Sequence, residues 1–490
     1  MSGNVTQREP DLYLLTFSEA FRIGKSQSEL DFVNIPLNAD IPLFIDPFAI
    51  SQRLDTWSEK AHRTLLSFFQ TIVESIRSGN YTRARSFLLH LREPNETHLG
   101  LSSGRPQGAG IGRQQAEEIF EALRDSEAVK TGFLSSLEEC ELMIDGIGRD
   151  KISDLTTNII RSHLADYTYS QSQLHGIATQ KKPLPACYDL ESQRWSAKYL
   201  ELPVWEGKPL LLVPKAIVRF TPAYNYQKYY NHFVLDFLQF EHLSASSSLV
   251  HTLKNGQRRV YKKSLKREYP CTKHFLYEFS LNHPEVLDNY RESLKEMENR
   301  DQISEFYIED ETVIANSLAT VLQSIVPGSE SAADYHKLMV GMVEFLFFPK
   351  LLCPIKEKEI HQGRKRIDIQ MENGARSGIF NRLHDVHKIP CAYVPFECKN
   401  YQTDVANPEI DQLAGRFSIN RGKAGFLCCR QFENRNLFLE RCKDTYTDGR
   451  GLILPLDDQT ILSFLEGIKH RRREEIDQTL SLMVREVCGS

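Results

Sequence analysis

The fold of this chain is decided by two short stretches in its C-terminal third, which read Arg366-Ile367-Asp368-Ile369 and Val394-Pro395-Phe396-Glu397-Cys398-Lys399. Side chains alternate between the two faces of a β-strand, so Glu397 and Lys399 share one face while Phe396 and Cys398 share the other. Asp368 likewise lies opposite the two isoleucines that flank it. We therefore expect two strands, each with an apolar face turned to a core and an acid on the other face.

The two acids and the lysine form a set that suits phosphodiester hydrolysis with a divalent metal. Mg²⁺ binds oxygen ligands and keeps several waters, so Asp368 and Glu397 are the candidate metal ligands, and the backbone carbonyl of Cys398 offers a further oxygen. A bound metal lowers the pKa of its water, and Lys399 can orient that water or stabilise the hydroxide. The sequence thus predicts a Mg²⁺ or Mn²⁺ site at these strand ends.

The segments around the two stretches alternate between helix and strand patterns. An apolar stripe predicts a packed helix over residues 332–347, and Asn407-Pro408 is typical of a helix start. Apolar strands are expected at residues 424–430 and 451–456, each followed by a helix. This order favours an α/β sheet with crossover helices. Pro395 favours an edge strand or a bulge at its position.

At these residues the chain resembles the PD-(D/E)xK nuclease superfamily, over roughly residues 331–470. The resemblance implies a restriction-endonuclease-like fold, with a mixed sheet flanked by helices, and makes Lys399 the catalytic lysine beside Asp368 and Glu397. In that family the helix before the Asp strand often carries an acid that reaches the metal, which implies Glu344. The helix after Glu-x-Lys often carries a glutamine, which implies Gln412 as a further catalytic residue.

The chain of 490 residues, with 41% hydrophobic content, is long enough for more than one core. We expect a large α+β N-terminal domain for recognition or regulation over residues 1–245. A basic and helical connector is expected over residues 246–330. The restriction-endonuclease-like α/β domain is expected over residues 331–490.

Composition gives the expected setting of the protein. The N-terminus lacks the basic and apolar regions of a signal peptide, and no apolar run is long enough to span a bilayer, which predicts a cytoplasmic protein without a membrane partner. The ten cysteines form no CxxC pair, which favours reduced and mostly buried thiols.

The net charge of −5 means that any affinity for nucleic acid must come from a local patch. Residues 254–273 carry eight basic residues against one acid, with two tyrosines interleaved that could stack on bases. A solvated basic loop is the alternative interpretation. The candidate nucleic-acid-binding residues are Lys254, Arg258, Arg259, Lys262, Lys263, Lys266 and Arg267.

These features together predict a Mg²⁺-dependent endonuclease that hydrolyses DNA, with an N-terminal domain that receives a partner protein or an activating signal. By analogy alone, such a fusion is typical of prokaryotic antiviral defence. One alternative is a catalytically silent nucleic-acid-binding or scaffolding protein with a nuclease-like fold, and another is a nuclease that acts on RNA. A homodimer fits the prediction, because cutting both strands of a duplex requires two sites.

Overall fold

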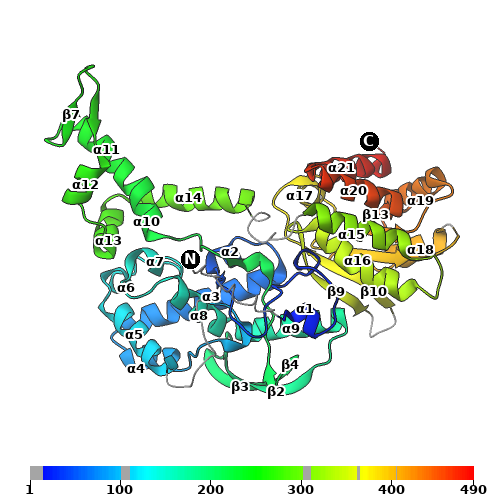
Figure 1. Cartoon of the computed structure of the whole chain (residues 1–490), viewed down its shortest axis with the longest axis horizontal. Coiled ribbons are helices and arrows are strands. Elements are labelled where there is room, and N and C mark those ends of the chain that lie inside the picture. The colour runs from blue at the N-terminus through cyan, green and yellow to red at the C-terminus, as the bar shows by residue number, and fades with distance from the viewer. Residues whose placement is uncertain (1–14, 101–110, 302–310, 361–364, 404, 490) are drawn as a thin grey trace, which may run out of the picture.

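The computed structural model describes residues 15–100, 111–301, 311–360, 365–403 and 405–489, and its apolar side chains gather in two cores. The first core draws on residues 17–294 and is joined by Phe348, Leu352 and Cys353. The second core draws on residues 314–487 and is joined by Leu174. We refer to residues 15–301 as the first unit and to residues 311–489 as the second unit; the two lie side by side in Figure 1.

The first unit is built mainly of helices around four separate two-stranded ladders. Its helices are α1 (Phe17–Ala20), α2 (Pro47–Ser51), α3 (Thr56–Arg77), α4 (Tyr81–Leu88), α5 (Ile111–Asp125), α6 (Glu127–Lys130), α7 (Cys140–Met143), α8 (Arg149–Ile159), α9 (Arg161–His175), α10 (Tyr226–Tyr229), α11 (Leu235–Ser244), α12 (Lys262–Glu268), α13 (Lys273–Asn282) and α14 (Pro284–Asp301). Short helical turns are η1 (Gln27–Glu29), η2 (Asn95–Thr97), η3 (Lys215–Ile217) and η4 (Tyr230–Val234). The ladders pair β1 (Phe44–Ile45) with β6 (Val218–Arg219), β2 (Gln180–Asp189) with β3 (Arg194–Leu202), β4 (Val204–Trp205) with β5 (Lys208–Pro209), and β7 (Val250–Thr252) with β8 (Arg258–Val260).

Helix α3 shows how local sequence builds this unit. Asp55 caps its N-terminus, where the carboxylate accepts a hydrogen bond from the backbone N–H of Ser58 at 2.8 Å. Leu65, Phe68 and Ile72 recur at helical spacing and are buried. The helix therefore presents one apolar face to the first core.

The second unit holds a five-stranded sheet with the strand order β13-β12-β11-β10-β9. Its strands are β9 (Leu351–Ile360), β10 (Lys365–Asn373), β11 (Tyr393–Lys399), β12 (Ala424–Cys429) and β13 (Leu452–Asp457). Its helices are α15 (Glu311–Ser324), α16 (Ala332–Phe347), α17 (Gly378–Asp385), α18 (Asn407–Ala414), α19 (Arg435–Thr447), α20 (Asp458–Lys469) and α21 (Glu474–Cys488). Strands β9, β10 and β11 pair antiparallel, whereas β11, β12 and β13 pair parallel. The expected mixed sheet flanked by helices is confirmed.

Aromatic packing fastens α16 to one face of this sheet. The Phe347 ring lies 5.8 Å from that of Phe396 on β11 and 5.6 Å from that of Phe426 on β12. The rings of Phe396 and Phe426 stack on each other at 4.9 Å. Because side chains alternate along a strand, Glu397 points to the opposite face, which is reached from α18.

The expectation that Pro395 marks an edge strand or a bulge is wrong, because β11 lies between β10 and β12 in the middle of the sheet. Pro395 pairs with Gln370 of β10 without a break in the register. On the other side its neighbour is Gly425, where an added Cβ would lie 2.9 Å from Cγ of the proline ring. The missing side chain of this glycine makes room for a proline in a central strand.

The connector expected over residues 246–330 is not a separate part of the structure, because its residues belong to both cores. Side chains between Val260 and Leu294 pack into the first core, whereas Ile314, Leu318 and Leu322 of α15 pack into the second. The second unit thus begins before residue 331. Figure 1 shows α11, the β7–β8 hairpin, α12 and α13 projecting as an arm at the end of the molecule away from the second unit.

Candidate functional site

The structure brings the two predicted acids together on neighbouring strands. Ile369 of β10 pairs with Phe396 of β11 in an antiparallel register. The neighbouring residues Asp368 and Glu397 therefore lie opposite each other, on the same face of the sheet. The backbone N–H of Cys398 donates a hydrogen bond to Oδ2 of Asp368 at 2.9 Å, which fixes the orientation of that carboxylate. The pairing of strands distant in sequence therefore creates the acid pair.

Glu397 is fully buried and is held by two cationic side chains. The Lys399 ammonium lies 2.7 Å from its Oε1 atom, and the Arg416 guanidinium forms an ion pair with its Oε2 atom. Within the described residues neither oxygen also accepts a hydrogen bond of normal geometry, so charge attraction provides its contacts. Burial lowers the pKa of Arg416, and the negative charge of Asp368 opposes this shift.

Gln412, the residue that the family resemblance implied, contacts this group from α18. Its Oε1 atom accepts a hydrogen bond from Nζ of Lys399 at 3.2 Å. Helix α18 begins at Asn407 with Pro408 in its first turn, so the predicted helix start is confirmed. Tyr401, whose ring centroid lies 5.9 Å from Nζ of Lys399, flanks the same ammonium group. Lys399 is thus oriented from both its own strand and the following helix.

Two residues of this site were missed by the reasoning from sequence. Arg416 follows Gln412 by four residues, and this helical spacing could have indicated that both lie on one side of the α18 terminus. His336 of α16 approaches from another element, and its Nε2 atom lies 3.2 Å from the carbonyl oxygen of Asp368. A carbonyl oxygen only accepts, so Nε2 carries the proton in this contact. No sequence spacing relates His336 to the acids.

The donor set is compatible with a hard divalent cation. Asp368 and Glu397 supply carboxylate oxygens on adjacent strands, and the cations Lys399 and Arg416 lie at the two oxygens of Glu397. No group of three or more His, Cys, Asp or Glu side chains arranged to hold a metal occurs in the described part of the chain. A metal here would take two carboxylates, with waters and the carbonyl of Cys398 as the remaining ligands.

The thiol of Cys398 has no evident part in such chemistry. Its hydrogen bond with Cys428 and its burial both raise its pKa well above the ordinary range. A protonated thiol is a poor metal ligand and a poor nucleophile. Only the backbone of Cys398 is therefore placed to contribute to the site.

Glu344 is not brought to the acid pair, which corrects its assignment as a metal ligand. It lies on α16 but forms a buried ion pair with Lys215 of the first unit, with 2.9 Å between Nζ and Oε1. Lys215 lies over the ring of Phe348. His336, at the other end of the helix, is the α16 residue that contacts Asp368. The rise of about 1.5 Å per residue along an α-helix separates the two positions by roughly 12 Å.

Glu344 belongs instead to a seam of buried charges between the two units. Asp31 accepts hydrogen bonds there from the hydroxyl of Tyr167 at 2.6 Å and from the backbone N–H of Cys353 at 3.2 Å. Glu372 of β10 accepts one from the backbone N–H of Thr56 at 2.6 Å. The seam therefore holds β9 and β10 against the first unit.

The predicted basic residues all lie on the arm, away from the acid pair (Figure 1). Most of them are exposed: Lys254, Arg258, Arg259, Lys263, Lys266 and Arg267. Arg258 donates to the hydroxyl of Ser246 at 2.7 Å, and Lys262 forms an ion pair with Asp236 and donates to the carbonyl of Asn231 at 2.6 Å. The structure thus gathers these residues into one basic surface but does not join that surface to the acids.

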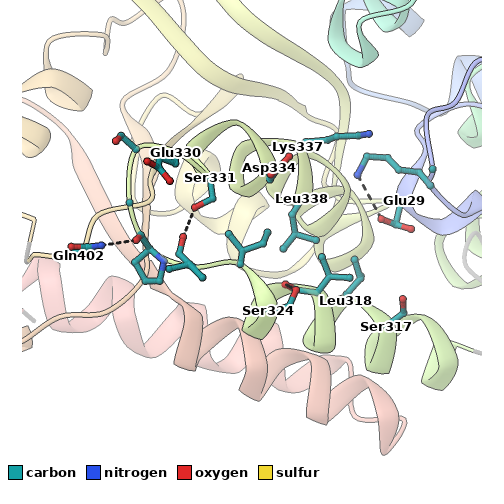
Figure 2. A pocket seen from close by; sticks show the side chains of 18 residues that line it. Glu29, Ser317, Leu318, Ser324, Glu330, Ser331, Asp334, Lys337, Leu338 and Gln402 are labelled. Carbon is teal, nitrogen blue, oxygen red and sulfur yellow. Dashed lines mark hydrogen bonds and ion pairs between the residues drawn. The ribbon is translucent and has the colours of Figure 1, made fainter.

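A cavity of about 1080 Å³ lies beside the site, between η1 of the first unit and helices α15 and α16 (Figure 2). It contains none of the predicted site residues. Its wall of residues 326–331 is fastened to Asn400, which directly follows Lys399 and donates to the carbonyl of Gly328 at 2.8 Å. Gln402 adds a hydrogen bond to the carbonyl of Pro327 at 3.0 Å. These hydrogen bonds therefore connect the cavity wall to the end of β11, where Lys399 lies.

Comparisons with known proteins cover only the first unit. The profile of a domain of unknown function (DUF8370) matches residues 22–225, which leaves Asp368, Glu397 and Lys399 outside the match. No curated protein and no solved structure matches the chain. Among the described helices, none is long and apolar enough to cross a membrane.

Proposed function

We propose that this chain is a metal-dependent nuclease whose active site is formed by Asp368, Glu397, Lys399 and Gln412. The observation that carries the proposal is that Asp368 on β10 and Glu397 on β11 lie opposite each other. Beside them, Lys399 donates a hydrogen bond to Gln412 at 3.2 Å. A restriction-endonuclease-like fold for the second unit is part of the proposal. It is supported by the mixed sheet, by α16 ahead of the Asp strand and by α18 after Glu-x-Lys.

Each side chain has a distinct role in this proposal. Asp368 and Glu397 would hold Mg²⁺ or Mn²⁺, which supplies a water of lowered pKa and offsets charge on the phosphorane. Lys399, whose ammonium group lies beside Glu397, would stabilise the negative charge that develops on the attacking oxygen. Gln412 keeps Lys399 oriented through its side-chain oxygen. The backbone N–H of Cys398 holds the Asp368 carboxylate in position.

We further propose DNA as the substrate, with the basic arm as a second contact with the phosphate backbone. The arm supplies exposed Lys and Arg side chains together with the half-exposed ring of Tyr261. Because the arm projects away from the second unit in Figure 1, a long polymer could contact both the arm and the second unit at once. RNA is the alternative polymer, and the assay below includes it.

The test is cleavage of supercoiled plasmid, linear duplex, single-stranded DNA and RNA with Mg²⁺, Mn²⁺ or EDTA. We expect metal-dependent cutting that falls by about 10²–10⁴-fold in Lys399→Ala. Lys423→Ala is the matched control, because the side chain of Lys423 donates a hydrogen bond to the carbonyl of Gly449 and lies outside the site. Equal cutting by folded Lys399→Ala and wild type would refute the proposal.

A silent nuclease-like module that only binds nucleic acid is the second candidate. The observation that favours it is the complete burial of Glu397 in ion pairs with Lys399 and Arg416. Such an arrangement is also expected if these residues only stabilise the fold. Metal titration separates the two candidates. Thermal stabilisation of wild type by Mn²⁺ that is lost in Asp368→Asn would exclude the silent module, whereas no stabilisation would favour it.

A further inference from the structure

We propose that Arg416 and the divalent metal compete for the acid pair, so that the guanidinium group closes the site until a metal displaces it. The inference rests on the proposed function and adds a regulatory element to the same site. It concerns a residue that is absent from the predicted catalytic set. Arg416 would thus set the metal concentration at which the site becomes competent.

The position of Arg416 follows from the end of α18. The helix ends at Ala414, Gly415 caps it, and the backbone N–H of Arg416 donates to the carbonyl of Leu413 at 2.9 Å. The side chain then turns inward and is only 5% exposed, where it meets Oε2 of Glu397. The negative charge of Asp368 also acts on it. The guanidinium group therefore lies at the carboxylates that a metal would need.

The balance of charge makes joint occupancy unfavourable. Asp368 and Glu397 carry two negative charges, and Lys399 and Arg416 carry two positive charges, so the group is neutral as it stands. A divalent cation would leave a buried group with an excess of two positive charges, and burial strengthens the repulsion between them. Lys399 stays bonded to Gln412, so Arg416 is the cation that can leave.

The side chain of Arg416 is held by one ion pair and not by a network of partners. In the described part of the chain its Nε and Nη1 atoms have no side-chain or backbone partner besides the ion pair with Glu397. Arg430, a partly buried arginine of this unit, is different, because it donates to the carbonyl of Leu322 at 3.2 Å and to the side-chain oxygen of Asn400 at 3.2 Å. Arg430 is anchored to the scaffold, whereas Arg416 loses little besides its ion pair when it moves.

The first experiment measures Mn²⁺ binding to wild type, Arg416→Gln and Arg450→Gln by calorimetry, without substrate. Arg450 is the matched control, because it forms an ion pair with Asp411 of α18 at 2.6 Å but does not touch the acids. We expect Arg416→Gln to bind Mn²⁺ at least about tenfold more tightly than wild type, since one competing charge is removed. We expect Arg450→Gln to bind it as wild type does.

The outcomes separate this inference from the proposed function. Equal or weaker Mn²⁺ affinity in Arg416→Gln would overturn the competition and leave the nuclease proposal standing. Absence of Mn²⁺ binding in every protein would overturn both. A fold check by circular dichroism accompanies each variant.

A second experiment uses the wild-type protein and so does not depend on the folding of a variant. Phenylglyoxal modifies accessible arginines, and mass spectrometry locates the modified residues. Without metal, Arg416 should be protected at 5% exposure and Arg450 should react at 42% exposure. Saturating Mn²⁺ should make Arg416 reactive and leave Arg450 unchanged. Continued protection of Arg416 in the metal-saturated protein would overturn the inference.

Discussion

The buried seam between the units allows a quantitative test through Lys215→Met. Lys215 and Glu344 are 2% and 1% exposed, with 2.9 Å between their charged atoms, and they come from different units. Methionine keeps the length of the side chain but removes the cation that faces Glu344. The substitution leaves a buried carboxylate without its ion-pair partner.

The expected loss is about 3–5 kcal/mol in the free energy of unfolding at about pH 8, the usual cost of breaking a buried ion pair from one side. Lys350→Met is the matched control. Its ion pair with Asp477 has the same 2.9 Å separation but side chains that are 37% and 19% exposed. Such a pair contributes about 0–1 kcal/mol. The double variant Lys215→Met with Glu344→Leu should recover most of the loss, because no charge then remains to be desolvated.

The loss should also depend on pH. Burial raises the pKa of Glu344 from 4.5 to about 7, so in the folded protein its carboxyl group takes up a proton as pH falls through neutrality. The unfolded chain takes up this proton only near its ordinary pKa, and the folded state therefore gains stability as pH falls between these values. We expect the loss caused by Lys215→Met to shrink to less than about 2 kcal/mol at about pH 5.

Urea unfolding followed by two probes measures these effects. The three tryptophans, Trp57, Trp195 and Trp205, all lie in the first unit, so their fluorescence reports on that unit while circular dichroism reports on both. A loss below about 1 kcal/mol at pH 8 would contradict the account of the seam. An equal loss at both pH values would contradict the raised pKa of Glu344.

The remaining predictions concern the arm, the cavity wall and the corrected metal ligand. Replacing Arg259, Lys263 and Arg267 with glutamine should lower the slope of log affinity against log salt for duplex DNA by about 2–3, and an unchanged slope would remove the arm from the DNA contact. Asn400→Ala should lower the free energy of unfolding by about 1–3 kcal/mol in urea, since partly buried carbonyls lose their donor; no change would show that water replaces the amide. Glu344→Gln should leave Mn²⁺ affinity unchanged, and a clear drop would restore this residue as a ligand.

Local pattern was sufficient to predict the elements that carry the site. The apolar stripe gave the helix at residues 332–347, and Asn407-Pro408 gave the start of α18. The period of two placed Glu397 and Lys399 on one face of β11, where the structure has them in contact. These features depend on neighbours within a few residues, so the sequence contains them directly.

Contacts between distant segments were decided only by the tertiary structure. Pro395 fits a central strand because Gly425 arrives beside it from β12, a fact that no pattern within β11 contains. Strand pairing sets the register that opposes the acids, and it also sets which cations reach them. The contact between Arg416 and Glu397 therefore became evident only from the packing of α18 against the sheet.

The same distinction explains why Glu344 was misplaced. Its position on α16 was predictable, but the sequence does not show that Lys215 of the other unit meets it. A buried carboxylate is drawn to the cation that the fold places nearest, because desolvation makes an unpaired charge costly. The sequence by itself indicated residues with suitable chemical groups, whereas the packing of the two units determined which of them lie together and which form ion pairs between the units.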